Sequence, residues 1–327
     1  MRDLIVTASL FADRLAVHAA LLTAALLTAV LFALTGVCAA QAARLLGAGQ
    51  ANLWRLLIAL IVLGNWAHWF GTGLSGSGLP WLRVAGGVGF GLGGWCAMQS
   101  LRRVGSTLTL LIVECCAALF GTAIGWWWLG AALEPSELLF GLLVLAGVVV
   151  GMTASPIPAL RREMILTGCL LATLAALFQA ISINLSRHAF TVLKTAGESL
   201  PPLGAAYQRL LGGCGVALLI YGCTLMVRRF SSRPLPPDAE ATPFPKSRLP
   251  AALWVGLNAL LGPVLGVTCM LWAISKVANP GLVQTVAATS TLLTVPFARR
   301  LEGAQPGWPY LIGCLLALLG IAGLLLS

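Results

Sequence analysis

Long apolar runs separated by short polar breaks make up most of the chain. A helix that crosses the hydrocarbon core of a bilayer needs about 17–25 such residues. The breaks contain helix-ending residues, as in Glu134-Pro135-Ser136 and Asn279-Pro280. The pattern therefore predicts ten membrane-spanning helices, over residues 18–43, 50–68, 80–101, 106–131, 137–153, 163–187, 203–226, 250–274, 281–298 and 308–326.

Short sequence matches, in the same order, relate the two halves of the chain. Each half holds five predicted spans, and because five is odd, the second half must enter the bilayer inverted relative to the first. The fold class predicted is therefore an all-α polytopic membrane protein with about ten transmembrane helices in two inverted five-helix repeats. The matches pair residues 22–27 with 166–171, 51–57 with 205–211, 103–105 with 276–278, and Gly141 with Gly313.

The expected organisation follows from these repeats. Residues 19–38 come after a basic start, as in a secretory signal, but they have a counterpart in the second half, so we expect a permanent span. The predicted segments are an N-terminal tail at 1–17, the first repeat at 18–153, a connection at 154–162, and the second repeat at 163–326 with a polar, Pro-rich linker at 227–249.

Composition adds that the chain has no room for a soluble domain. Of its 327 residues, 59% are hydrophobic and 9% are charged, and the mean hydropathy is +0.93. This excludes most soluble enzyme classes. The net charge of +10 resides mostly at the ends of apolar runs, where basic residues contact lipid headgroups, so no nucleic-acid partner is expected.

No cofactor or metal is expected either. The nine cysteines lie within apolar stretches and form no C-x-x-C pair. Gly89, Gly91 and Gly94 match a dinucleotide-binding pattern, but no strand precedes them. Their four-residue spacings with neighbouring glycines instead favour close helix approach.

Most of both halves, about residues 20–152 and 164–326, resembles a known family, the ten-helix EamA branch of the drug/metabolite transporter superfamily. The closest match lies at residues 273–278, Pro296, Leu301, Glu302 and Gly313. The first half departs from the family pattern, since Ala123 replaces its proline and Leu129 its glutamate. The resemblance implies a solute carrier, commonly an exporter of amino acids or other small metabolites.

Glu114 is the most informative single position, because it lies within the fourth predicted span. A charged carboxylate facing lipid at that depth costs about 2.5 kcal/mol or more, so the side chain must face protein or water. It could bind a proton or a cationic group and release it on a conformational change. Alternatively, it only holds helices together, since its repeat counterpart is Ala287.

Arg55 and Arg209 occupy equivalent positions of the two repeats, where the EamA family often has an arginine. Their relation favours a shared structural or ion-pairing role. Extension of the side chains to a membrane surface is one reading, and anion binding or pairing with Glu114 is the other.

Polar and aromatic residues in four other spans are candidates for the cavity lining. Those in the sixth span follow helical spacing and can share one face, whether they line a cavity or bond neighbouring helices. The candidate substrate-binding or coupling residues besides Glu114 are Trp95, Gln99, Gln179, Ser182, Asn184, Trp272 and Gln284.

These features predict a membrane transporter of a small organic metabolite, amino-acid-like or drug-like, that exports its solute by alternating access between the repeats. The alternatives are a lipid or lipid-linked flippase and a non-transporting membrane scaffold. An enzyme is not predicted, because the spans hold neither paired carboxylates nor a nucleophile with a base. The expected partners are a small solute, the bilayer of the plasma (bacterial inner) membrane and a coupling proton.

Two indications of orientation oppose each other. The odd-numbered connections carry twelve basic residues and the other side six. The positive-inside rule then puts both termini outside, whereas the EamA resemblance implies that both face the cytoplasm.

Overall fold

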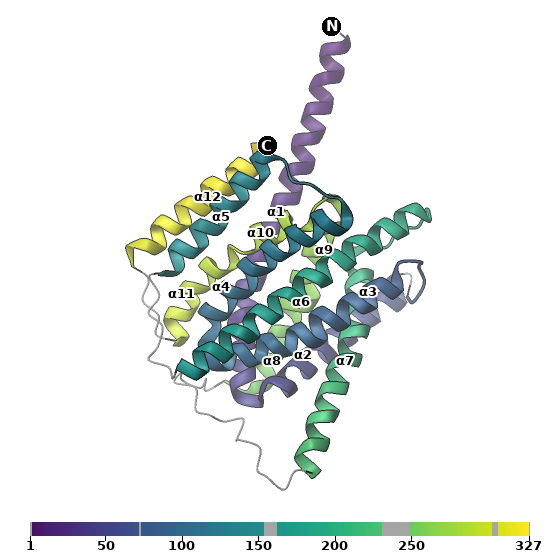
Figure 1. The fold of residues 1–327 in the computed structure, drawn as a ribbon. Coiled ribbons are helices and arrows are strands. Elements are labelled where there is room, and N and C mark those ends of the chain that lie inside the picture. Colours follow the sequence, from purple (N-terminus) through teal and green to yellow (C-terminus); the bar gives the residue numbers. More distant parts are fainter. Residues whose placement is uncertain (1, 72, 154–161, 231–248, 303–306, 327) are drawn as a thin grey trace.

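The computed structural model describes residues 2–71, 73–153, 162–230, 249–302 and 307–326, and over these ranges it contains helices and no strand (Figure 1). The predicted all-α class is therefore confirmed. The elements are α1 (Arg2–Leu46), α2 (Ala48–Phe70), α3 (Leu79–Gly86), η1 (Gly87–Gly93), α4 (Gly94–Leu129), α5 (Pro135–Thr153), α6 (Arg162–Thr195), α7 (Pro202–Phe230), α8 (Ala251–Ala259), η2 (Leu260–Gly266), α9 (Val267–Lys276), α10 (Pro280–Ala287), α11 (Ser290–Glu302) and α12 (Trp308–Leu326).

Seven helices of the described chain are long and apolar enough to cross a membrane. One of them, Leu79–Leu129, has 51 residues, which at ~1.5 Å per residue is more than twice the ~30 Å hydrocarbon thickness. Gly105 interrupts this helix with a φ of 82°. Across the interruption, the hydroxyls of Ser100 and Thr109 form a hydrogen bond of 2.9 Å. The chain thus folds back at Gly105 and forms the two spans predicted on either side of it.

The remaining spans are built from shorter helices. A two-residue turn separates α10 from α11, and together they cover the ninth predicted span. The helix α12 supplies the tenth. The described ranges therefore contain the ten spans that the apolar runs predict.

The repeats are visible in an unusual local structure. The segments η1 and η2 are both π-helical, and each residue of η2 lies 173 positions after its counterpart in η1. The sequence match of residues 103–105 with 276–278 has the same separation. Pro263 lies within η2. The third span of each half thus carries the same irregularity at the same place.

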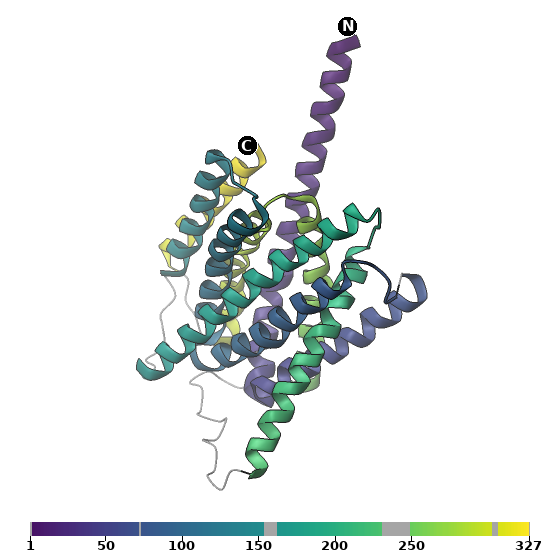
Figure 2. The ribbon, with the colours of Figure 1, turned by 45° about the vertical axis from the view of Figure 1, so that its right-hand side comes forward.

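The last spans of the two halves, α5 and α12, pack side by side (Figures 1 and 2). Glycines allow this contact, since a Cβ at Gly147 would lie 2.7 Å from the carbonyl oxygen of Gly313. At the other end of the chain, α1 extends well beyond the bundle in both views, so residues 2–17 of the predicted tail belong to this helix. Most of the predicted linker at 227–249 and of the connection at 154–162 lies outside the described residues.

A second close contact, between α3 and α7, positions the interior of the bundle. A Cβ at Gly86 of α3 would overlap the backbone carbonyl of Arg209, and a Cβ at Gly212 of α7 would overlap that of Arg83. The two backbones therefore touch at both glycines, in the manner of small-residue helix contacts in membranes. This contact holds Arg209 against the start of η1.

We expect Gly212→Ala to lower the free energy of unfolding by about 1–3 kcal/mol, because the added methyl group must separate two packed backbones. The measurement is thermal unfolding of the purified protein in detergent. Gly215→Ala is the matched control in the same helix, because a Cβ there meets nothing within 4 Å. Equal midpoints for the two variants would contradict the close contact.

Candidate functional site

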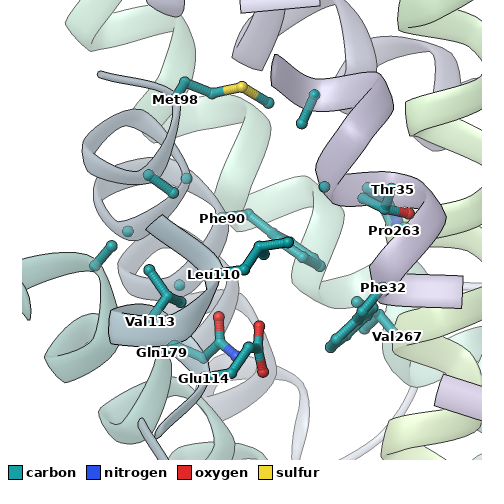
Figure 3. Close-up of a pocket in the computed structure, with 18 of the residues that line it drawn as sticks. Phe32, Thr35, Phe90, Met98, Leu110, Val113, Glu114, Gln179, Pro263 and Val267 are labelled. Carbon is teal, nitrogen blue, oxygen red and sulfur yellow. The ribbon is translucent and has the colours of Figure 1, made fainter. Parts of the chain in front are cut away.

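A cavity lies inside the bundle and is lined by α1, α2, α4, α6, α7 and α9 together with both π-helical segments (Figure 3). Equivalent residues of the two repeats contribute to the lining: Gly89 and Phe90 from η1, and Gly262 and Pro263 from η2. The cavity volume is about 140 Å³, roughly ten times the ~10–15 Å³ that one water molecule needs. It can therefore hold a small organic molecule.

The π-helical turns help to form this cavity. A π-helix widens a helix locally, and such turns occur frequently at functional sites. In η1 every second residue is glycine, from Gly87 to Gly93, and two of these glycines, Gly89 and Gly93, line the cavity without a side chain that would fill it. In η2, Pro263 cannot donate a backbone hydrogen bond and locally breaks the regular helical pattern.

Glu114 of α4 lines the cavity and is only 4% exposed. Nε2 of Gln284 donates a hydrogen bond to its carboxylate, and the side chain of Gln179 is a second hydrogen-bond partner. Figure 3 shows the Gln179 amide beside the carboxylate. Gln179 belongs to α6 and Gln284 to α10. One carboxylate of the first repeat is thus held by amides from two helices of the second.

Arg55 and Arg209 line the same cavity. Arg209 is 4% exposed, and its Nη2 donates to Oγ of Ser182 at 2.7 Å. Its guanidinium lies over the ring of Phe90, 5.0 Å from the centroid. Arg55 donates from Nε and Nη2 to Oδ1 of Asn52, at 3.0 and 2.8 Å. Both arginines thus point into the protein, and in the described residues neither forms an ion pair with Glu114.

Six of the residues singled out in the sequence come together in this way. Glu114, Gln179 and Gln284 form the carboxylate cluster. Arg55 and Arg209 contribute to the lining, and Ser182 holds Arg209 while donating to the carbonyl oxygen of Ala85.

The other four lie outside the cavity lining. Trp95 packs against the cluster around Cys96, because its neighbours Gly94 and Ala97 occupy the cavity side of the helix. Oε1 of Gln99 accepts a hydrogen bond from Arg103.

The same helical geometry turns Asn184 and Trp272 away from the cavity. Nδ2 of Asn184 donates to the carbonyl oxygens of Gly121 and Ala180, so this residue connects α6 to α4. Trp272 packs in an apolar cluster with Met270. A polar or aromatic side chain within a span therefore does not by itself indicate a position in the cavity lining. Asn184 and Trp272 contribute to helix packing instead.

The apolar part of the lining could not be predicted from the sequence. Phe32, Thr35 and Met270 contribute to it from α1 and α9, and nothing in their local sequence distinguishes them from lipid-facing residues. Asn52, which holds Arg55 three residues later on the same helix, carried a detectable signal. An amide and a guanidinium one turn apart within an apolar run are expected to bond each other.

The fold and the cavity together define a polytopic membrane protein with two five-helix repeats around a central solute-sized space. The EamA-like transporter family matches residues 20–153 and 166–326, one match for each repeat, and the chain belongs to this family. It is therefore an integral membrane protein and a transporter of the drug/metabolite type. Members of this family are transporters rather than enzymes.

Solved structures support the fold. A structure described only as the crystal structure of a protein superimposes with a TM-score of 0.63, over 92% of this chain and 95% of its own, at 20% sequence identity. This identity supports a common fold and nothing more specific. In all, 27 solved chains match, and none of the curated proteins searched matches.

We expect a double-mutant cycle of Glu114→Ala and Gln284→Ala to give a coupling energy of about 1–3 kcal/mol, because the two side chains share a buried hydrogen bond. The measurement is the free energy of unfolding of the purified protein in detergent.

The control cycle combines Glu114→Ala with Asn184→Ala, since Asn184 bonds to other groups of α4. Here the effects should add to within about 0.5 kcal/mol. Additivity in both cycles would show that the carboxylate and the Gln284 amide do not interact.

Proposed function

We propose that the protein exports a small organic metabolite, amino-acid-like or drug-like, across the plasma (bacterial inner) membrane by alternating access. The observation that carries this proposal is the cavity between the repeats, in which Glu114 is held by amides from the second repeat. In the proposal, the solute occupies this cavity and Glu114 is the residue that binds a coupling proton or a cationic group of the solute.

The lining supports a partly apolar solute. Phe32, Phe90, Met98, Leu110 and Val113 all contribute apolar surface to the cavity (Figure 3). Small-molecule sites typically combine such a lining with a few convergent polar groups. Glu114, Gln179 and the two arginines are those groups, so the cavity suits a solute with an apolar body and at least one polar end.

The position of Glu114 supports a coupling role. Its carboxylate bonds to α6 and α10 across the boundary between the repeats. Protonation or solute binding would replace one of these bonds and so weaken the connection between the halves. Alternating access requires such a change, because one repeat must then move against the other around the bound solute.

The π-helical segments support the same mechanism. They interrupt the third span of each repeat where those spans line the cavity. Irregular turns of this kind are tolerated at membrane depth where they border protein or a cavity. We assign them the bending that opens one side of the cavity and closes the other.

The test is metabolite profiling of cells and medium, comparing cells that express the wild-type chain, Glu114→Gln or an empty vector. We expect a solute to move to the medium with wild type, and its efflux to fall by about 10–100-fold with Glu114→Gln. That factor corresponds to the loss of a charged hydrogen-bonding group worth about 1.5–3 kcal/mol.

Glu163→Gln is the matched control, because Glu163 is an exposed carboxylate in the first turn of α6. It should export like wild type. Equal export by wild type and Glu114→Gln would show that Glu114 takes no part in the mechanism, while the proposal that the protein is a carrier would stand. No solute moved by wild type, despite confirmed insertion, would overturn the transport proposal and favour a flippase or a scaffold.

A further inference from the structure

Two arginines contribute to the lining of one cavity inside a membrane protein. This arrangement has a high free-energy cost, because each charged group is removed from water. A charged side chain within a bilayer normally pairs with another charge or faces water. Arg55 and Arg209 come from α2 and α7, the second span of each repeat, and both line the cavity. Their presence there requires a compensating interaction.

The protein itself supplies that interaction only in part. Arg209 donates from Nη2 to the neutral hydroxyl of Ser182, while its buried Nε and Nη1 atoms have no hydrogen-bond partner. Arg55 donates only to the neutral amide oxygen of Asn52 among the described residues. Neither guanidinium contacts a carboxylate in that part of the chain. Glu114 lines the same cavity but forms no ion pair with either arginine, so within the described ranges each guanidinium lacks an anionic group in contact with it.

The surrounding backbone leaves space beside both guanidiniums. A Cβ at Gly94 would lie 2.7 Å from Nη2 of Arg55, and a Cβ at Gly89 would lie 3.5 Å from Nη2 of Arg209. Both glycines line the cavity. Any larger residue at Gly94 would push the guanidinium of Arg55 away, so these positions keep the two cationic groups next to the open space.

An arginine with a purely structural role would differ from this arrangement. Buried polar groups are normally satisfied by hydrogen bonds within the protein, and removal of a partner from a buried charge is strongly destabilising. Arg209 lines a cavity that is large enough for a solute, and its buried Nε and Nη1 atoms lack a hydrogen-bond partner in the part of the chain that the structure describes. The missing acceptor therefore fits a group that arrives with the solute.

We propose that Arg55 and Arg209 bind the carboxylate of the transported solute, whose apolar body then lies against Phe90 and the apolar wall of the cavity. A guanidinium fork matches the two oxygens of a carboxylate. The substrate class is an organic acid with an apolar body, and an amino acid belongs to it when its ammonium group reaches Glu114. This inference rests on the proposed function, because it assigns a substrate class to the same cavity.

The test measures binding to the full-length wild-type protein in detergent by isothermal titration calorimetry. The probes share one apolar body and differ at one end: 3-phenylpropionate, 3-phenylpropanol and 3-phenylpropylamine, with the corresponding two-carbon and four-carbon series. We expect the carboxylates to bind at least tenfold more tightly than the matched alcohols and amines, as a charge-assisted hydrogen bond requires.

Variants then assign this preference to the arginines. Arg209→Gln and Arg55→Gln should each weaken carboxylate binding by about tenfold or more and leave alcohol binding unchanged. Arg209→Lys should retain part of the preference, because it keeps the charge but loses the planar fork. Arg162→Gln, which changes an exposed arginine at the start of α6, is the matched control and should bind like wild type.

The wild-type comparison keeps the inference testable even where a variant does not fold. Equal binding of carboxylates and alcohols, or no binding of any carboxylate in the panel, would overturn it. Carboxylate binding without export of any solute would instead leave the inference and overturn the proposed function. Export of a solute by a protein that binds carboxylates and alcohols equally would leave the proposed function and overturn the carboxylate inference.

Discussion

The bilayer supplies no hydrogen-bonding partner, so each polar group within the spans of this chain must be satisfied by the protein or by something bound to it. Most of them are. Thr285 and Thr294 bond to carbonyls of their own helices, and Nδ2 of Asn184 bonds to α4 and to its own helix. Among the groups without a partner in the described residues are Nε and Nη1 of Arg209, a residue of the cavity lining, and Oε1 of Gln284, which bonds to Glu114 of that lining through its Nε2. An unsatisfied donor within the spans is costly because no water is there to bond it, so such a donor on a residue of the cavity lining indicates a binding site.

Close helix contacts determine where that site forms. Gly86 and Gly212 bring the backbones of α3 and α7 into contact, and Arg209 lies at the same contact. Ser182 of α6 joins this arrangement by bonding both Arg209 and the carbonyl oxygen of Ala85. The third, sixth and seventh spans therefore meet around one arginine. Glycine spacing thus affects more than packing, since it determines which polar side chains reach the interior.

The ten spans and the two repeats could be predicted from the sequence, because apolar length and the position of helix-ending residues follow directly from the bilayer. Glu114 could be singled out for the same reason. The lining could not be predicted in full, since in a span that is apolar all round nothing separates a side chain facing lipid from one facing a cavity. Trp95 and Gln179 show the difference: both looked suitable, but only Gln179 lies on the face that borders the cavity. The π-helical turns were also missed, although they shift the helical phase of every residue that follows them.

The cavity combines symmetric walls with asymmetric chemistry. Its walls include η1 and η2, and Arg55 and Arg209 repeat one another. A site with full twofold symmetry would accept an asymmetric solute in two equivalent orientations. The Glu114 carboxylate breaks this equivalence, because the residue 173 positions later is Ala287. A second difference lies in the lining, where Gly94 has Val267 as its counterpart. Under the proposed binding mode, a solute with one acidic end is therefore held in a single orientation. The two repeats differ in their polar groups: both contribute an arginine, but only the first contributes the acid that the second repeat's amides hold.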